Sequence, residues 1–172
     1  MRKRRRTVGR SVPTLASVIL LATVLGACSA DGGQEVAGET TSRSAVTAAE
    51  YANRATPICV SGAAAAAKVA PTSGMTQAKN AEALQALAQS THATVAQLRA
   101  LPLPEPAEPY RKWLDTVDQT ANEVEQAGVA LAAGDTGAVQ QHASTASALT
   151  DTAQSAARLL GLSSCAFDGS TD

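Results

Sequence analysis

The chain has 172 residues, of which 14 are Lys or Arg and 15 are Asp or Glu, so its formal net charge is −1. Six of the basic residues and none of the acidic ones lie within residues 1–27, and without that segment eight basic residues face 15 acidic ones, a net charge of −7. Such a chain lacks the clustered positive charge that nucleic-acid binding requires. The same charge balance argues against electrostatic adhesion to anionic lipid.

Residues 1–27 have the pattern of a signal peptide. A strongly basic start is followed by an apolar stretch over 15–27, which is shorter than the about 20 residues that span a bilayer. Leu25, Gly26 and Ala27 then precede Cys28 and match a bacterial lipobox, although Ala or Ser is commoner at the position of Gly26. The alternatives are an ordinary signal peptide in which Cys28 has no role, and an uncut membrane anchor.

A lipobox predicts that the mature chain begins at Cys28 and carries acyl chains there. One acyl chain binds a membrane only marginally, and the diacylglyceryl group typical of a lipobox cysteine supplies the two chains that stable anchoring requires. We therefore expect a protein held at the extracytoplasmic face of the cell membrane. General secretory export is favoured over the twin-arginine route, since Arg5-Arg6 lacks the apolar residues that usually follow.

Residues 28–44 are predicted to form the lipidated cysteine and a flexible tether, because they contain almost no apolar side chains. Residues 45–166 have the pattern of a helical domain, and 167–172 form a short tail. The first helical region covers 45–70. Thr56-Pro57 is a good helix start, so either a short helix over 46–54 precedes a second one, or a single helix is kinked there.

Three further helices are expected at about 77–101, 109–133 and 136–161, with Gly134-Asp135 ending one and capping the next. Each carries apolar and small residues at steps of three and four, and no strand-like alternation of any length occurs. The prediction is an all-α fold, an antiparallel up-down-up-down four-helix bundle. The many small residues predict close helix packing with little room for a large cavity. The Pro-rich segment at 101–109 is a stiff crossover or a docking segment.

Three cysteines are an odd count for an exported protein. Lipidation would use Cys28, which leaves Cys59 and Cys165 to pair in an oxidising compartment, with two free buried thiols as the alternative. In an up-down bundle the first helix begins where the fourth ends, which brings these two cysteines together. Closing a loop on the order of 100 residues would contribute about 4.7 kcal/mol in the chain-entropy model.

The chain has only four aromatic residues, and this topology places all of them at the end of the bundle that holds the two cysteines. They are Tyr51, Tyr110, Trp113 and Phe167. One interpretation is a patch that binds a partner or ligand, and the other is a hydrophobic plug that seals the bundle.

The sequence offers no catalytic, cofactor or metal motif. His92 and His142 lie on different predicted helices without a Glu-x-x-His pattern. Asp115 and Asp118 share a helix face that no histidine is expected to join, which is typical of a solvated acidic surface. No nucleophile elbow or phosphate loop is present. We therefore expect a protein that is not an enzyme and binds no cofactor.

The pattern of Tyr51, Ile58-Cys59, Trp113, Gly134-Asp135 and the segment from Ala156 to Cys165 resembles small actinobacterial lipoproteins of unknown function. The resemblance implies a location and a helical fold, and no activity. Two hypotheses follow. The first is a lipid-anchored interaction or accessory module for an unidentified envelope protein. The alternative is a carrier or sensor of a small apolar ligand, bound at the aromatic end of the bundle.

Overall fold

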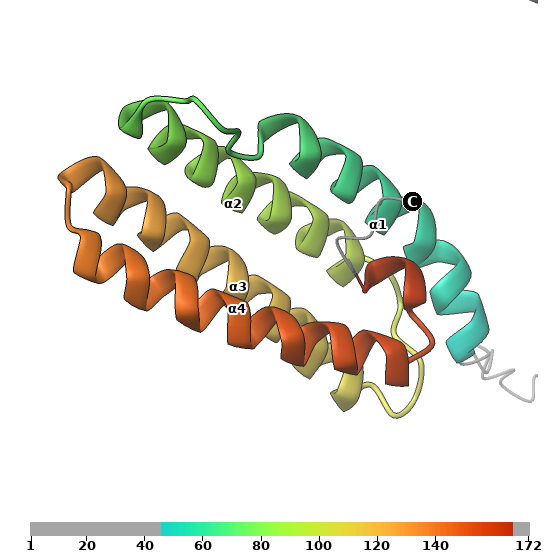
Figure 1. The fold of residues 1–172 in the computed structure, drawn as a ribbon. Coiled ribbons are helices and arrows are strands. Elements are labelled where there is room, and N and C mark those ends of the chain that lie inside the picture. Colours follow the sequence, from blue (N-terminus) through green and yellow to red (C-terminus); the bar gives the residue numbers. More distant parts are fainter. Residues whose placement is uncertain (1–45, 167–172) are drawn as a thin grey trace, which may run out of the picture. The chain divides into compact units, whose positions relative to one another are not determined.

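The computed structural model describes residues 46–166, which form four long helices and one short 3-10 turn. In chain order they are α1 (Ala48–Val69), α2 (Gln77–Arg99), α3 (Glu108–Ala133), α4 (Thr136–Leu159) and η1 (Ser163–Cys165). Successive helices run in opposite directions, and the described residues contain no strand (Figure 1). The predicted all-α, antiparallel bundle is confirmed.

α1 begins near the start of the predicted region 45–70 and not at Thr56-Pro57. The helix begins after Thr47, whose hydroxyl accepts from the backbone N–H of Glu50 at 3.2 Å while the Glu50 carboxylate accepts from the backbone N–H of Thr47 at 2.8 Å. This reciprocal pair is a capping box. The backbone hydrogen bond from Thr47 lowers the pKa of Glu50.

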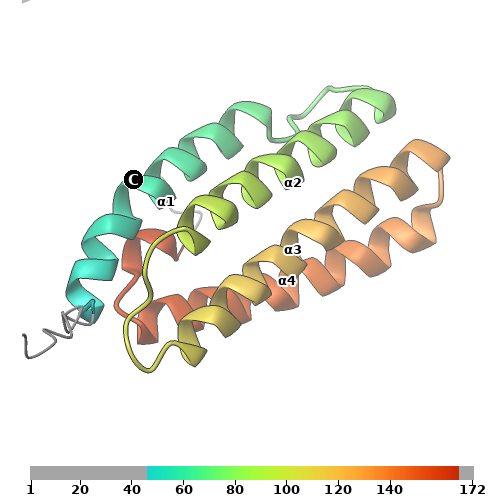
Figure 2. The ribbon, with the colours of Figure 1, turned by 180° about the vertical axis from the view of Figure 1, so that it is seen from behind.

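α1 then continues through Pro57 as a single helix. Of the two alternatives, the single helix is the observed one, and Figure 2 shows α1 curving along its length. Tyr51, Ala55 and Cys59 are all buried and lie four residues apart, so they form one face against the rest of the bundle. Pro57 is exposed, and burial of the opposite face offsets the hydrogen bond that proline cannot donate.

The other helix boundaries follow the sequence signals closely. Gly134 adopts a left-handed conformation with φ of 76° and ends α3, and the Asp135 side chain accepts from the backbone N–H of Ala138 at 2.9 Å to cap α4. Gly161, with φ of 74°, follows α4. The chain then turns back through η1, which carries Cys165 toward α1.

The hydrophobic core lies at the end of the bundle where α1 and α3 begin and α4 ends. Its largest fully buried side chains are Tyr51, Leu98, Leu114, Val95 and Cys59. The crossover between α2 and α3 packs onto this core through Leu101 and Leu103, and Pro104 is buried. The crossover alternative for the Pro-rich segment therefore matches its observed position.

The four helices do not close into a ring. α2 packs along α3, and α3 along α4, whereas the backbone of α1 lies close to those of α2 and η1 alone. No Cα atom of α1 lies within 8 Å of one in α3 or α4. In both ribbon views α1 and α2 form one side of the bundle and α3 and α4 the other (Figures 1 and 2). The seam between α1 and α4 is thus bridged by η1 at one end of the bundle.

Candidate functional site

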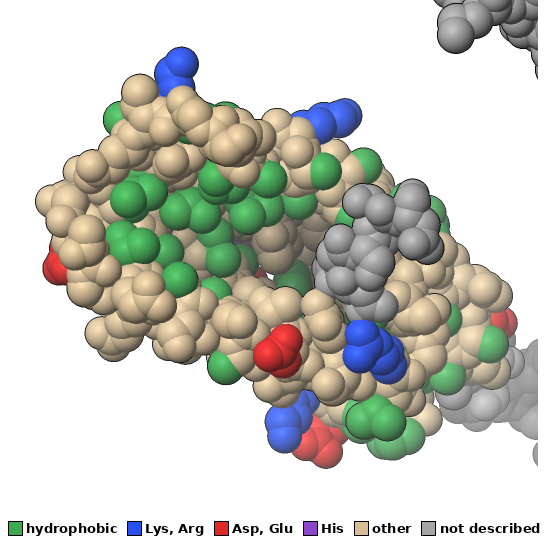
Figure 3. All heavy atoms as spheres, in the orientation of Figure 1, with side chains coloured by type: hydrophobic (Ala, Val, Ile, Leu, Met, Phe, Trp, Pro, Cys, Tyr) green, Lys and Arg blue, Asp and Glu red, His purple; other side chains and the backbone are tan. Residues whose placement is uncertain are grey.

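A cavity of about 330 Å³ lies between the helices and is open at the α1–α4 seam. In Figure 3, hydrophobic side chains gather in a hollow between the α1–α2 rim and α4. The prediction of little internal room is therefore wrong. The small side chains do not draw α1 and α4 into contact, so they leave space unfilled. The lining comes from all four helices and η1: Cys59, Gly62, Ala63, Ala66, Leu87, Thr91, Thr94, Leu98, Trp113, Val117, Thr120, Ala121, Val124, Thr150, Ala153, Gln154 and Cys165.

The lining of the cavity extends along the helix axes. Its lining residues occupy positions 87–98 of α2 and 113–124 of α3. At 1.5 Å per helical residue, each of these stretches is about 16 Å long. Beyond the cavity α2 and α3 approach closely, because a Cβ atom added at Gly128 would lie 3.1 Å from the carbonyl oxygen of Ala81.

The wall is uncharged, although four threonines contribute to it. Every threonine hydroxyl donates to the carbonyl four residues earlier in its own helix, at distances of 2.8–3.0 Å: Thr91, Thr94, Thr120 and Thr150. Their hydroxyl protons are therefore already used. Since no Asp, Glu, Lys, Arg or His lines the cavity, the site is built for an apolar group rather than for an ion.

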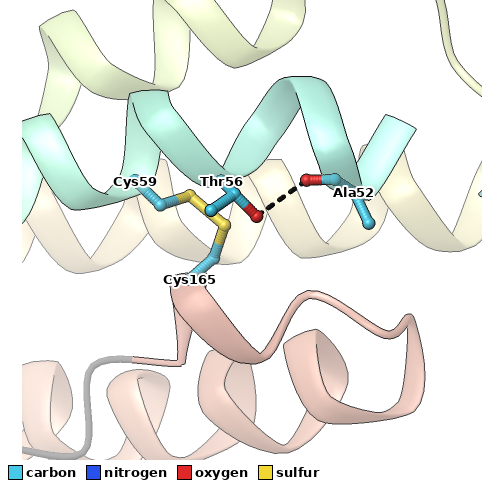
Figure 4. The surroundings of a disulfide bond; sticks show 4 residues. All are labelled: Ala52, Thr56, Cys59 and Cys165. Carbon is cyan, nitrogen blue, oxygen red and sulfur yellow. Dashed lines mark hydrogen bonds between the residues drawn. A yellow bond between two sulfur atoms is a disulfide. The ribbon is translucent and has the colours of Figure 1, made fainter. Parts of the chain in front are cut away.

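The Cys59–Cys165 disulfide lies in the lining at the core end of the cavity and confirms the predicted pairing. It joins α1 to η1 (Figure 4). The two cysteines are 1% and 5% exposed. One helical turn before Cys59, the Thr56 hydroxyl donates to the carbonyl of Ala52 at 2.9 Å. The disulfide thus holds α1, at Cys59, against η1.

Three of the four aromatic residues are gathered beside the disulfide in one buried cluster. The rings of Tyr51 and Tyr110 meet edge to face, 5.1 Å apart, and Trp113 forms part of the cavity wall. All three are at most 6% exposed, so they fill the interior and offer no exposed patch. Phe167, the fourth member of the proposed patch, lies outside the described residues.

Two buried donors in this cluster lack a hydrogen-bond partner among the described residues: the Tyr51 hydroxyl and the Trp113 indole nitrogen. Burial, together with the neighbouring Tyr110, raises the pKa of Tyr51 to about 12. The Tyr51 hydroxyl is therefore protonated across the physiological range and is poorly suited to proton transfer at neutral pH.

A charged network between α2 and α3 was missed by the sequence interpretation, which expected no histidine beside Asp115 and Asp118. His92 Nδ1 donates to Asp118 at 2.8 Å, and Arg99 bridges Asp118 at 3.1 Å and Asp115 at 2.8 Å. Burial would raise the pKa of Asp118, but the hydrogen bonds from His92 and Arg99 hold it below its ordinary value. The same two carboxylates raise the pKa of Arg99 against the effect of its own burial.

A second pair, His142 and Glu123, joins α4 to α3 at 2.7 Å. Both histidines thus make one carboxylate contact between neighbouring helices. Within residues 46–166 no group of three or more His, Cys, Asp or Glu side chains is arranged to hold a metal ion. The signal that could have revealed the network is a pair of oppositely charged helix faces. His92 and Arg99 lie two turns apart on one helix, and Asp115 and Asp118 lie one turn apart on the next.

The proposed lipobox, Leu25, Gly26, Ala27 and Cys28, lies outside the described residues, as does the whole of the predicted signal peptide. Among the helices of residues 46–166, none combines the length and apolar character needed to cross a membrane. Comparisons with protein-family models, with curated proteins and with solved structures gave no match. The candidate function therefore rests on the chain's own chemistry.

Proposed function

We propose that this protein is a lipid-anchored, non-catalytic component of the extracytoplasmic face of the cell membrane, whose helical domain holds a small apolar ligand as a carrier or sensor. The observation that supports the ligand is the uncharged cavity of about 330 Å³, open at the α1–α4 seam. Protein interiors are close-packed and contain few voids larger than a water molecule. A hollow of this size falls at the lower end of the range for ligand pockets, about 300–1,000 Å³.

The anchor is supported by the sequence alone. A basic start, a short apolar stretch and Leu25-Gly26-Ala27-Cys28 favour processing at Cys28 and its acylation. The test is the intact mass of the protein extracted from its own membranes. A chain beginning at Cys28 with the added mass of a diacylglyceryl group is expected. An unacylated chain cut at another position would contradict the anchored form.

The ligand-binding function is tested by filling the cavity from its open side. Ala66 lines the cavity on α1, so Ala66→Phe would place a phenyl ring in the space that a ligand occupies. Its neighbour Ala65 is exposed and does not line the cavity, which makes Ala65→Phe a matched control on the same helix. The readout is the enhanced emission of a neutral apolar fluorophore, such as 1-aminoanthracene, bound to the mature chain.

We expect Ala66→Phe to weaken binding of the fluorophore by at least about tenfold, or ~1.4 kcal/mol. Ala65→Phe should bind as the unmodified chain does, and circular dichroism should show equal helix content in both variants. Equal binding by the two variants, or no binding by the unmodified chain, would contradict the cavity as a ligand site.

The interaction-module hypothesis has less support in the described residues. Their exposed large hydrophobic side chains are Val60, Met75, Val129 and Leu159, which lie on three different helices and one loop. Single exposed hydrophobic residues are common on soluble proteins and do not mark an interface. The cavity is the more specific feature, and it favours a ligand over a docked protein.

A further inference from the structure

We propose that the ligand is the acyl chain of a membrane lipid with a neutral or zwitterionic head group, held lengthwise in the cavity while the head group stays at the α1–α4 seam. This inference rests on the proposed function and assigns the chemical class of its ligand. Three properties of the described residues support it: the shape of the cavity, the chemistry of its wall and the position of its opening.

The shape of the cavity suits one extended chain. The lining follows α2 and α3 for about 16 Å along the helix axes. A volume of about 330 Å³ beside a lining of that length has room for one extended alkyl chain. A flexible alkyl chain can follow this lining along its whole length.

The wall has few polar groups that could recognise a ligand. The four threonine hydroxyl protons are used within their own helices, and the other polar groups on lining side chains are the Gln154 amide and the Trp113 indole N–H. A polar or charged ligand would lose its hydration there without equivalent hydrogen bonds. An alkyl chain has no hydrogen bonds to water that it could lose. Its transfer from water is favourable by about 0.8 kcal/mol for each buried CH₂.

The hollow opens between the α1–α2 rim and α4 (Figure 3), where the backbones of α1 and α4 stay apart. A chain can therefore enter sideways, and a head group attached to its end remains in water. The predicted mature chain has a net charge of −7, which disfavours an anionic head group. The charge thus favours a neutral or zwitterionic lipid over an anionic one.

The segment between the proposed anchor and the domain is short enough to keep the cavity near the membrane. Residues 29–47 separate Cys28 from the first residue of α1. With the flexible tether that the composition predicts, a chain of that length would have an average reach of roughly 24 Å. A tether of that reach would keep the domain close to a bilayer, where acyl chains are the most abundant apolar groups.

The test uses the mature chain with Cys28→Ala, so that no acyl group of its own is present. Native mass spectrometry and calorimetry would measure binding of lysophosphatidylcholines of increasing chain length. We expect one lipid per protein and an affinity that rises up to roughly fourfold for each added methylene. The rise should stop once the chain exceeds the length of the lining, about 16 Å. Ala66→Phe should shift this limit to shorter chains, and Ala65→Phe should not.

The outcomes separate this inference from the proposed function. Binding of the neutral fluorophore without binding of any lysolipid would overturn the acyl-chain ligand and leave the cavity as a ligand site. Binding of neither would overturn both. Affinity that ignores chain length would also overturn the inference, because it would place the lipid outside the cavity.

A further comparison shows whether the bound acyl chain comes from a membrane lipid or from the protein's own anchor. Acylated wild-type protein, stripped of loosely bound lipid, should still take up one lysolipid. Failure of the acylated protein to bind, together with binding by Cys28→Ala, would show that the protein's own anchor fills the cavity. That result would overturn the assignment to a membrane lipid.

Discussion

Cys59 and Cys165 are 106 positions apart in the sequence, yet their Cα atoms lie 5.1 Å apart across a disulfide. The bond joins α1 to η1, which carries the end of the described chain. Because the backbone of α1 does not come close to α3 or α4, this bond, the packing on α2 and the ring contact of Tyr51 with Tyr110 hold α1 in place. The disulfide therefore shapes the cavity as well as stabilising the fold.

Removing the disulfide is expected to lower stability strongly. Closing a loop on the order of 100 residues contributes up to about 4.7 kcal/mol through the entropy of the unfolded chain. The Cys59→Ala, Cys165→Ala double variant should therefore unfold at a markedly lower denaturant concentration than the oxidised protein. A reductant should shift the midpoint of the wild type toward that of the variant and leave the variant unchanged. Equal midpoints in all four measurements would show that the bond does not form.

The close approach of α1 to α2 at Gly62 makes a second prediction. A Cβ atom added at Gly62 would lie 2.5 Å from Thr94 Oγ1 and 2.8 Å from its Cγ2. Gly62→Ala should destabilise the protein by about 1–3 kcal/mol through overpacking. In a Thr94→Ala background the same change should be stabilising, since alanine exceeds glycine in helix propensity by about 1 kcal/mol. Urea unfolding of the four proteins in this cycle measures the coupling, and additive effects would contradict the contact.

The network between α2 and α3 predicts a pH dependence of stability. The folded-state pKa of Asp118 is lowered, so its contribution is fully present above the unfolded pKa of about 3.9 and is lost as the pH falls through the lower folded value. Asp118→Asn should cost about 1 kcal/mol at neutral pH, and this difference should shrink below about pH 4. Asp115→Asn is the control, because this exposed carboxylate contacts Arg99 alone among the described residues and should cost less. A difference between wild type and Asp118→Asn that is constant from neutral to acid pH would contradict the assignment.

The buried hydroxyl of Tyr51 predicts that its removal does not destabilise the protein. It has no hydrogen-bond partner among the described residues, so Tyr51→Phe removes a desolvated polar group while keeping the ring against Tyr110. The variant should be as stable as the wild type or more stable, by up to about 1 kcal/mol at neutral pH.

The same substitution should act at alkaline pH. Because the folded-state pKa of Tyr51 is raised from 10.0 to about 12, the preference for the neutral form is present below the unfolded pKa and is lost as the pH rises through the folded one. Wild type should lose stability between these two values, and Tyr51→Phe should lose less. Thermal unfolding over that range checks both parts, and a destabilised Tyr51→Phe would reveal a hydrogen bond to the hydroxyl.

The elements that could be predicted from the sequence depend on local signals. Apolar spacing located the helices, Gly134-Asp135 marked a boundary through its backbone conformation and cap, and topology brought Cys59 to Cys165. Pro57 left two alternatives open, because proline is common at a helix start. Tertiary burial of Tyr51 and Cys59 on the opposite face favours the single helix that is observed.

The features that could not be predicted depend on how helices are placed against each other. A stripe of alanines is compatible with tight packing and with an unfilled hollow. The hollow forms here because α1 and α4 stay apart. The contact of His92 with Asp118 likewise depends on the register of α2 along α3. The periodicity of a single helical segment predicts neither the distance between two helices nor their register.

The most direct measurement of the central claim is an intermolecular nuclear Overhauser experiment on the mature protein with a lysophosphatidylcholine bound. Methyl labelling would compare Thr94 and Val117, which line the cavity, with Val60 and Val129, which are 56% and 49% exposed. We predict contacts from the alkyl chain to Thr94 and Val117 and none to the two exposed valines. Contacts confined to Val60 and Val129 would place the lipid on the outer surface and contradict the account.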